Sequence, residues 1–119
     1  MAVRRRIDAV AGRAAVEAVV SGGDGDLATA VRFLLEELAA SEEGHTVEVR
    51  VPPYGAVQAI AGPRHTRGTP PNVIETDAVT WIALATGALA WRDAVATDRV
   101  TASGSRADLS DYLPVRWRA

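Results

Sequence analysis

Apolar residues recur with helical spacing in two stretches near the N-terminus. From Leu27 to Leu38 they stand three or four positions apart, which places them on one face of a helix: Leu27, Ala30, Val31, Leu34, Leu35 and Leu38. A looser version of the same period runs from Ile7 to Val20. The glycine-rich residues 21–25 separate the two stretches, and Asp24 or Asp26 can cap the second through its carboxylate. The pattern therefore predicts two consecutive helices.

After Gly44 the spacing of the apolar residues changes from the helical period of 3.6 to the strand period of 2. Val47, Val49 and Val51 alternate with polar residues, which is typical of a strand with one buried face. The two prolines that follow cannot continue a strand, because proline lacks the backbone N–H. The apolar run at 56–60 can then return as the second strand of an antiparallel hairpin.

The second half of the chain mixes short strands with helices. Thr76 or Asp77 can cap a helix that Gly87 ends. Ser105 and Asp108 have the spacing of a capping box, which predicts a terminal helix with a proline just beyond it. The expected elements are strands at 73–75 and 100–103 and helices at 77–88, 91–97 and 105–112.

The order of the predicted elements defines the fold class. Strands cluster and helices flank them without strict alternation, so we expect an α+β fold. With 119 residues, of which 48% are hydrophobic, the chain is long enough for one domain with its own core. We expect a single domain over residues 1–119, with a helical N-terminal part at 1–40 and the sheet and remaining helices at 45–119.

Charge and residue types narrow the candidate chemistry. A net charge of -2 argues against nucleic-acid binding, which needs a cationic surplus on one face. The chain has no cysteine and two histidines, so it lacks a thiol nucleophile and the ligand set of a typical metal site. Its apolar runs are too short to span a membrane. We therefore expect no enzyme activity, no cofactor, no metal and no stable membrane insertion.

The most specific pattern lies between Asn72 and Gly104. A strand leads to an Asp at the start of a helix, then to an aromatic residue, a Gly at the helix end, a short helix, a short strand and another Gly. The matching positions are Asp77, Trp81, Leu84, Gly87, Leu89, Ala94, Val100 and Gly104. This ordered set resembles the sterol carrier protein family, and residues 64–71 resemble its short actinobacterial branch, the bacterial sterol carrier orthologs. Asp98 stands where the family often has Gly, and Asp can adopt the left-handed conformation there.

The resemblance implies a curved sheet of about five strands, with helices packed on one face and a hydrophobic tunnel between the layers. It implies a non-catalytic domain for lipid binding or lipid transfer, with a sterol, fatty acyl or phospholipid ligand. The expected cavity-lining residues are Leu34, Leu38, Val47, Val49, Val57, Trp81, Ile82, Leu84, Trp91 and Val95. Trp91 could plug the mouth of the tunnel. The same spacings also make a filled core, and the sequence leaves both alternatives open.

A loop after the predicted hairpin carries a candidate anion site. Arg64, His65 and Arg67 bring two guanidinium groups and an imidazole together, and arginines bind phosphates and carboxylates in bidentate fashion. These residues could hold a lipid head group at the tunnel mouth. Alternatively, the arginines could pair with Glu48, Glu75 or Asp77 and anchor the loop.

Two further functions stay open at this stage. With a filled core, the chain could be a protein-interaction or accessory module that forms a homodimer through Phe33, Trp117 or an outer strand. Alternatively, Phe33 packs on the first helix, and the alternating tail at 115–119 packs on the domain or extends the sheet. An accessory part of a thiol-dependent enzyme ranks last, because no catalytic set is present. For the first function we expect a cytoplasmic protein that binds a small apolar ligand.

Overall fold

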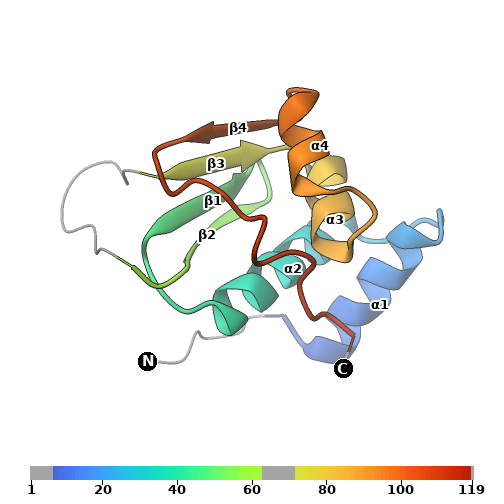
Figure 1. Ribbon diagram of the computed structural model, residues 1–119. Helices are drawn as coiled ribbons and strands as arrows, with labels where there is room; N and C mark the ends of the chain where they lie inside the picture. Colours follow the sequence, from blue (N-terminus) through green and yellow to red (C-terminus); the bar gives the residue numbers. More distant parts are fainter. Residues whose placement is uncertain (1–6, 63–71, 119) are drawn as a thin grey trace.

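The structure of the chain, a computed structural model, describes residues 7–62 and 72–118 (Figure 1). Along the chain its elements are α1 (Ala9–Val20), α2 (Leu27–Ser41), β1 (Val47–Val51), β2 (Gly55–Ala59), β3 (Val73–Thr76), α3 (Ala78–Thr86), α4 (Trp91–Ala96) and β4 (Val100–Ser103). This order confirms the predicted α+β class. The ends of the elements differ from the predicted ones by a few residues, and one predicted helix is missing.

The strands form one mixed sheet in the order β2-β1-β3-β4. β1 and β2 make the predicted antiparallel hairpin, in which Val49 lies opposite Val57. β3 runs parallel to β1, with Ile74 beside Val49, and β4 is antiparallel to β3. The described part of the chain thus has four strands, where the family resemblance implies about five.

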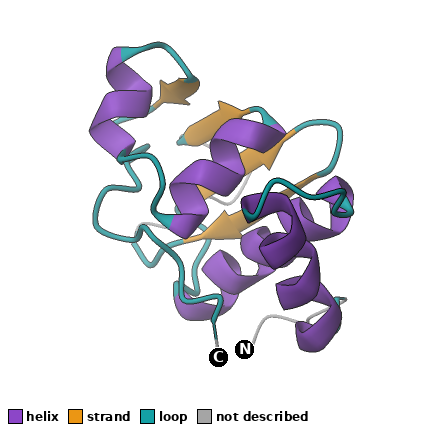
Figure 2. Cartoon of the chain, turned by 90° about the vertical axis from the view of Figure 1, so that its right-hand side faces the viewer, coloured by secondary structure: helices purple, strands orange, loops and turns teal. Residues whose placement is uncertain are grey.

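One face of the sheet is apolar and the other is polar. Along β1 the valines are buried and the residues between them are half-exposed, and in β3 Ile74 is buried while Glu75 is exposed. The buried side chains belong to the same core cluster as the inner faces of α2 and α3. After a turn of 90°, a helix crosses in front of the strands and further helices lie below them (Figure 2). The period-2 pattern of β1 and the period-3.6 pattern of α2 therefore meet in one apolar layer.

Aspartate caps set the starts of α1, α2 and α3. Asp26 accepts a hydrogen bond from the Thr29 backbone N–H at 3.1 Å, and Asp77 accepts one from the Thr80 N–H at 2.8 Å. These bonds satisfy backbone donors that have no partner inside the helix. At the other end of α3, Gly87 adopts a left-handed φ of 89°, as the sequence predicts.

Helix α1 packs on α2 through an aromatic side chain. Phe33 has no accessible area, and a Cβ added to Gly12 of α1 would lie 2.2 Å from the Phe33 ring atom Cδ1. The close approach of the two helices therefore needs a glycine at position 12. Phe33 packs on the first helix, and it is not available as a surface residue for dimerisation.

The predicted terminal helix at 105–112 is wrong. Residues 105–118 form turns and extended stretches. The buried side chains of this stretch form two pairs, Ala107 with Leu109 and Val115 with Trp117, and the members of each pair are two positions apart, which is the period of an extended chain. The Asp108 carboxylate accepts a hydrogen bond from the Ser110 N–H at 2.8 Å, so it stabilises a local turn instead of a helix start. Tertiary burial has overridden a weak local helix signal.

The left-handed conformation expected of Asp98 is observed, with a φ of 57°. Among the described residues no helix is long and apolar enough to cross a membrane.

Candidate functional site

Half of the predicted cavity-lining residues form a closed core. The side chains without accessible area are Leu34, Leu38, Val47, Val49 and Trp81. A space large enough for one water molecule would leave accessible area on the side chains around it. In this structure the layer between the sheet and the helices is therefore filled at these five positions.

Trp81 is the largest side chain in this core, and its polar atom is satisfied. The indole Nε1–H donates a hydrogen bond to the backbone carbonyl of Val31 in α2 at 3.2 Å. A buried indole without such a partner would leave a desolvated donor. The bond therefore ties α3 to α2 across the layer.

The other predicted lining residues range from fully buried to exposed. Ile82 is 5% exposed and Leu84 is 1% exposed, while Val57 and Trp91 are half-buried. Val95 is 45% exposed, because α4 buries only Ala94 and the next residue points about 100° away around the helix. Val95 thus lies outside the apolar layer in this structure.

The predicted anion site of Arg64, His65 and Arg67 lies outside the described residues. Three carboxylates were expected as alternative partners of these arginines. In the structure Glu48 pairs with Arg50, Asp77 caps α3, and Glu75 is exposed.

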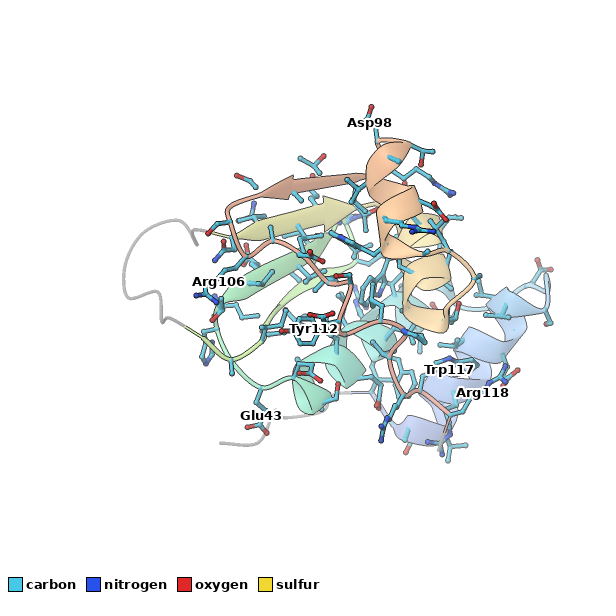
Figure 3. All side chains as sticks on the ribbon, viewed as in Figure 1. Glu43, Asp98, Arg106, Tyr112, Trp117 and Arg118 are labelled. Atoms are coloured by element: carbon cyan, nitrogen blue, oxygen red, sulfur yellow. The ribbon has the colours of Figure 1, made fainter. Side chains whose placement is uncertain are left out.

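The C-terminal segment, residues 105–118, crosses the molecule and completes the core. It runs from the end of β4 to α1, and Figure 3 shows Arg106, Tyr112 and Trp117 along its path. Ala107, Leu109, Val115 and Trp117 from this segment belong to the core cluster. Two hydrogen bonds hold its backbone to the rest of the domain. The Arg106 N–H donates to the Asn72 side-chain oxygen at 2.9 Å. The Val115 N–H donates to the Ala85 carbonyl at 2.9 Å. The tail therefore packs on its own domain.

Two hollows lie side by side where α3 ends against this segment. The larger, of about 680 Å³, is lined by Val20, Thr86, Gly87, Ala88 and residues 114–118. The smaller, of about 370 Å³, is lined by Leu84, Gly87, residues 89–92, Ser110, Leu113 and Pro114. Both include Gly87 and Pro114, which face each other. We call the two hollows together the arginine groove.

The arginine groove combines apolar and cationic side chains. Arg92, Arg116 and Arg118 line it, and among the described residues that line it none is Asp or Glu. A third hollow, of about 200 Å³, contains Arg106 together with Asp108 and Asp111, so it has no comparable excess of positive charge. The chain as a whole carries a net charge of -2, so the sign of the arginine groove is opposite to that of the protein.

Histidine and acidic side chains are the candidates for metal binding or acid–base chemistry among the described residues. They contain no group of three or more His, Asp or Glu side chains that could hold a metal ion. His45 is exposed, with its Nδ1 at 2.6 Å from the Gln58 side-chain oxygen. Hydrogen bonds from Thr29, Thr80 and Ser110 lower the pKa of Asp26, Asp77 and Asp108, which is opposite to the shift that a general acid needs.

Sequence reasoning missed the arginine groove. Its residues come from α1, the end of α3, the start of α4 and the C-terminal segment, so no local motif unites them. The available signal was the alternation at 115–118, where Val115 and Trp117 are buried and Arg116 and Arg118 are exposed.

The chain was compared with known protein families and with curated proteins. A family model described as "Bacterial SCP ortholog" matches residues 24–115. No curated protein matches the chain.

Proposed function

This chain belongs to the family of bacterial sterol carrier protein (SCP) orthologs, as its sequence predicts, and we propose that it is a non-catalytic lipid-binding domain. The proposed ligand is a sterol, a fatty acyl chain or a phospholipid, bound between the sheet and the helices and carried in the bacterial cytoplasm.

The observation that supports this function is the composition of the layer between the sheet and the helices. The inward residues of β1, α2 and α3 are almost all aliphatic or aromatic, and they form one continuous cluster. Such a layer could exchange contacts between its own side chains for contacts with an apolar ligand at little difference in free energy, because both bury apolar surface.

Ligand uptake would require side chains to leave the filled layer. The C-terminal segment is the part of the core best suited to move, since it has no helix or strand of its own. Leu109 and Trp117 reach the core from this segment. We propose that an apolar chain takes the place of these side chains when the segment lifts.

A second function is favoured by the filled core itself. A domain in which Leu34, Val49 and Trp81 have no accessible area already has the packing of a stable scaffold. Such a domain could serve as an accessory or protein-interaction module and form a homodimer through an edge strand of the sheet. Phe33 and Trp117 are buried in the monomer, so they would not provide that interface.

A cavity-forming substitution tests the carrier function. Leu109→Ala removes a fully buried side chain from the C-terminal segment, and we expect a loss of about 2–5 kcal/mol in the free energy of unfolding. If the layer accepts lipid, a fatty acid or sterol should restore much of this loss and bind the variant more tightly than the wild type. Urea unfolding with and without ligand measures both effects.

Leu35→Ala is the matched control. Leu35 is also fully buried, but it belongs to helix α2, near Gly55 of β2, and not to the C-terminal segment. We expect a comparable loss of stability with less recovery on adding ligand. If no apolar ligand stabilises the wild type or Leu109→Ala, and native mass spectrometry shows an empty dimer, the module is the correct function.

A further inference from the structure

We propose that the arginine groove is a separate binding site for a free long-chain carboxylate, with the carboxylate at its arginine rim and the start of the chain on its apolar floor. The choice of an amphiphile rests on the proposed function. The existence of the site does not depend on that function, because the groove lies on the surface at the end of α3, outside the filled layer.

The charge of the groove selects an anion. Three guanidinium groups line it without a carboxylate among the described lining residues, on a protein whose net charge is -2. Guanidinium groups bind carboxylates through paired N–H···O bonds.

The floor of the larger hollow selects an apolar neighbour for that anion. Val20, Ala88, Pro114 and Val115 line it next to the arginines. Val20 is 49% exposed, one of the largest exposed fractions for an aliphatic side chain in the described part of the protein. The volume of about 680 Å³ falls within the usual range of small-molecule sites, roughly 300–1,000 Å³. A carboxylate with an alkyl chain satisfies both parts of the lining.

The two arginines of the tail differ in availability. The Arg118 guanidinium lies 4.6 Å from the Trp117 ring centroid, and its Nε is 3.6 Å from a Glu17 carboxylate oxygen. These contacts hold Arg118 in place and satisfy part of its charge. Arg116 is exposed and makes no ion pair with another described residue, so it is the main candidate for the ligand carboxylate.

Part of the groove lies outside the residues that the family model matches. The family match covers residues 24–115, whereas Val20 and residues 116–118 lie beyond its two ends. The arginines of the larger hollow, Arg116 and Arg118, therefore come from the tail, and α1 adds Val20 to its apolar floor.

The chain offers closely matched variants for a test. Val20→Glu puts a carboxylate into the groove, and Val10→Glu makes the same change on an exposed valine of the same helix outside it. Arg116→Gln and Arg99→Gln form a second pair, since Arg99 is also exposed and does not line the groove. Titrations with dodecanoate, dodecanol, inorganic phosphate and phosphatidylglycerol vesicles, followed by two-dimensional 1H–15N NMR, give affinity and location together.

We expect dodecanoate to bind more tightly than dodecanol or phosphate and to shift the amide signals of Gly87, Ala88 and Arg116. Val20→Glu and Arg116→Gln should each weaken dodecanoate binding about threefold or more, as the loss of an exposed ion pair does, while their controls leave it unchanged. Added salt should weaken binding to the wild type.

Two outcomes would overturn the groove as a carboxylate site, and a third would support it. Dodecanoate and dodecanol could bind equally well and shift only the amide signals of the core layer. This result would refute the groove and leave the proposed function standing. Binding to the vesicles without binding to free dodecanoate would assign the arginines to a membrane surface. Dodecanoate binding in the groove, with no recovery of Leu109→Ala by any apolar ligand, would instead support the groove and refute the core as a lipid site.

Discussion

Gly12→Ala tests how tightly α1 is docked on α2. The new Cβ would lie 2.2 Å from Cδ1 and 2.4 Å from Cγ of the Phe33 ring, far below a van der Waals contact. Both the ring and the helices would have to shift, and overpacking of this kind costs about 3 kcal/mol. The better helix propensity of alanine returns about 1 kcal/mol. The expected net loss is therefore about 2 kcal/mol in the free energy of unfolding.

Urea unfolding followed by far-ultraviolet circular dichroism measures this loss, and a double-mutant cycle assigns its cause. In a Phe33→Ala background, which removes the ring atoms from this contact, Gly12→Ala should instead stabilise the protein by about 1 kcal/mol, the gain in helix propensity. Ala14→Gly on an exposed position of the same helix is the control for propensity alone, with an expected loss of about 1 kcal/mol. If Gly12→Ala is as stable as the wild type, the close contact between α1 and Phe33 is refuted.

Three further predictions concern the second half of the chain. Trp81→Phe removes the hydrogen bond to the Val31 carbonyl and should lower the free energy of unfolding by about 1–3 kcal/mol; a neutral effect in urea unfolding would contradict the role of this bond. The backbone hydrogen bond from Thr80 is the main cause of the lowered pKa of Asp77, so its stabilisation is present above the ordinary value of 3.8 and is lost as pH falls through the lower folded-state pKa. Asp77→Asn keeps the cap without titrating, so its stability should depend less on pH below about pH 4, and identical acid unfolding curves would refute this. Gly87→Ala must hold a φ of 89° and should lower the melting temperature by several degrees, whereas an unchanged value would show that the helix end can rearrange.

The arrangement of the core bears on both proposed functions. A carrier needs a layer that opens, and a scaffold needs one that stays closed. The described residues show the closed arrangement, in which Leu109 and Trp117 from the C-terminal segment contribute to the core. The response of Leu109→Ala to lipid therefore separates the two functions more directly than binding to the wild type does.

Local sequence was sufficient for the elements whose signals are periodic or capped. The valines of β1 alternate strictly, α2 keeps one apolar face, and Asp77 and Gly87 mark the ends of α3, so these elements could be predicted. Their inward faces could be predicted too, because period and burial are linked. The ordered landmarks after Asn72 were enough to predict the family that the match over residues 24–115 confirms.

Tertiary structure decided where a local signal was weak or where distant segments meet. Ser105 to Asp108 has a capping-box spacing, yet burial of Ala107 and Leu109 favours an extended path, since a single helical turn has little stability of its own. Whether the apolar layer is filled could not be predicted, because a tunnel and a dry core use the same residue types. The arginine groove joins α1, the end of α3 and the tail, which only the folded chain brings together. The sequence determined the segments with a periodic pattern or a cap, and the tertiary structure determined the weakly coded segment at 105–112 and which segments share a surface, because contact between distant residues depends on how all the elements pack at once.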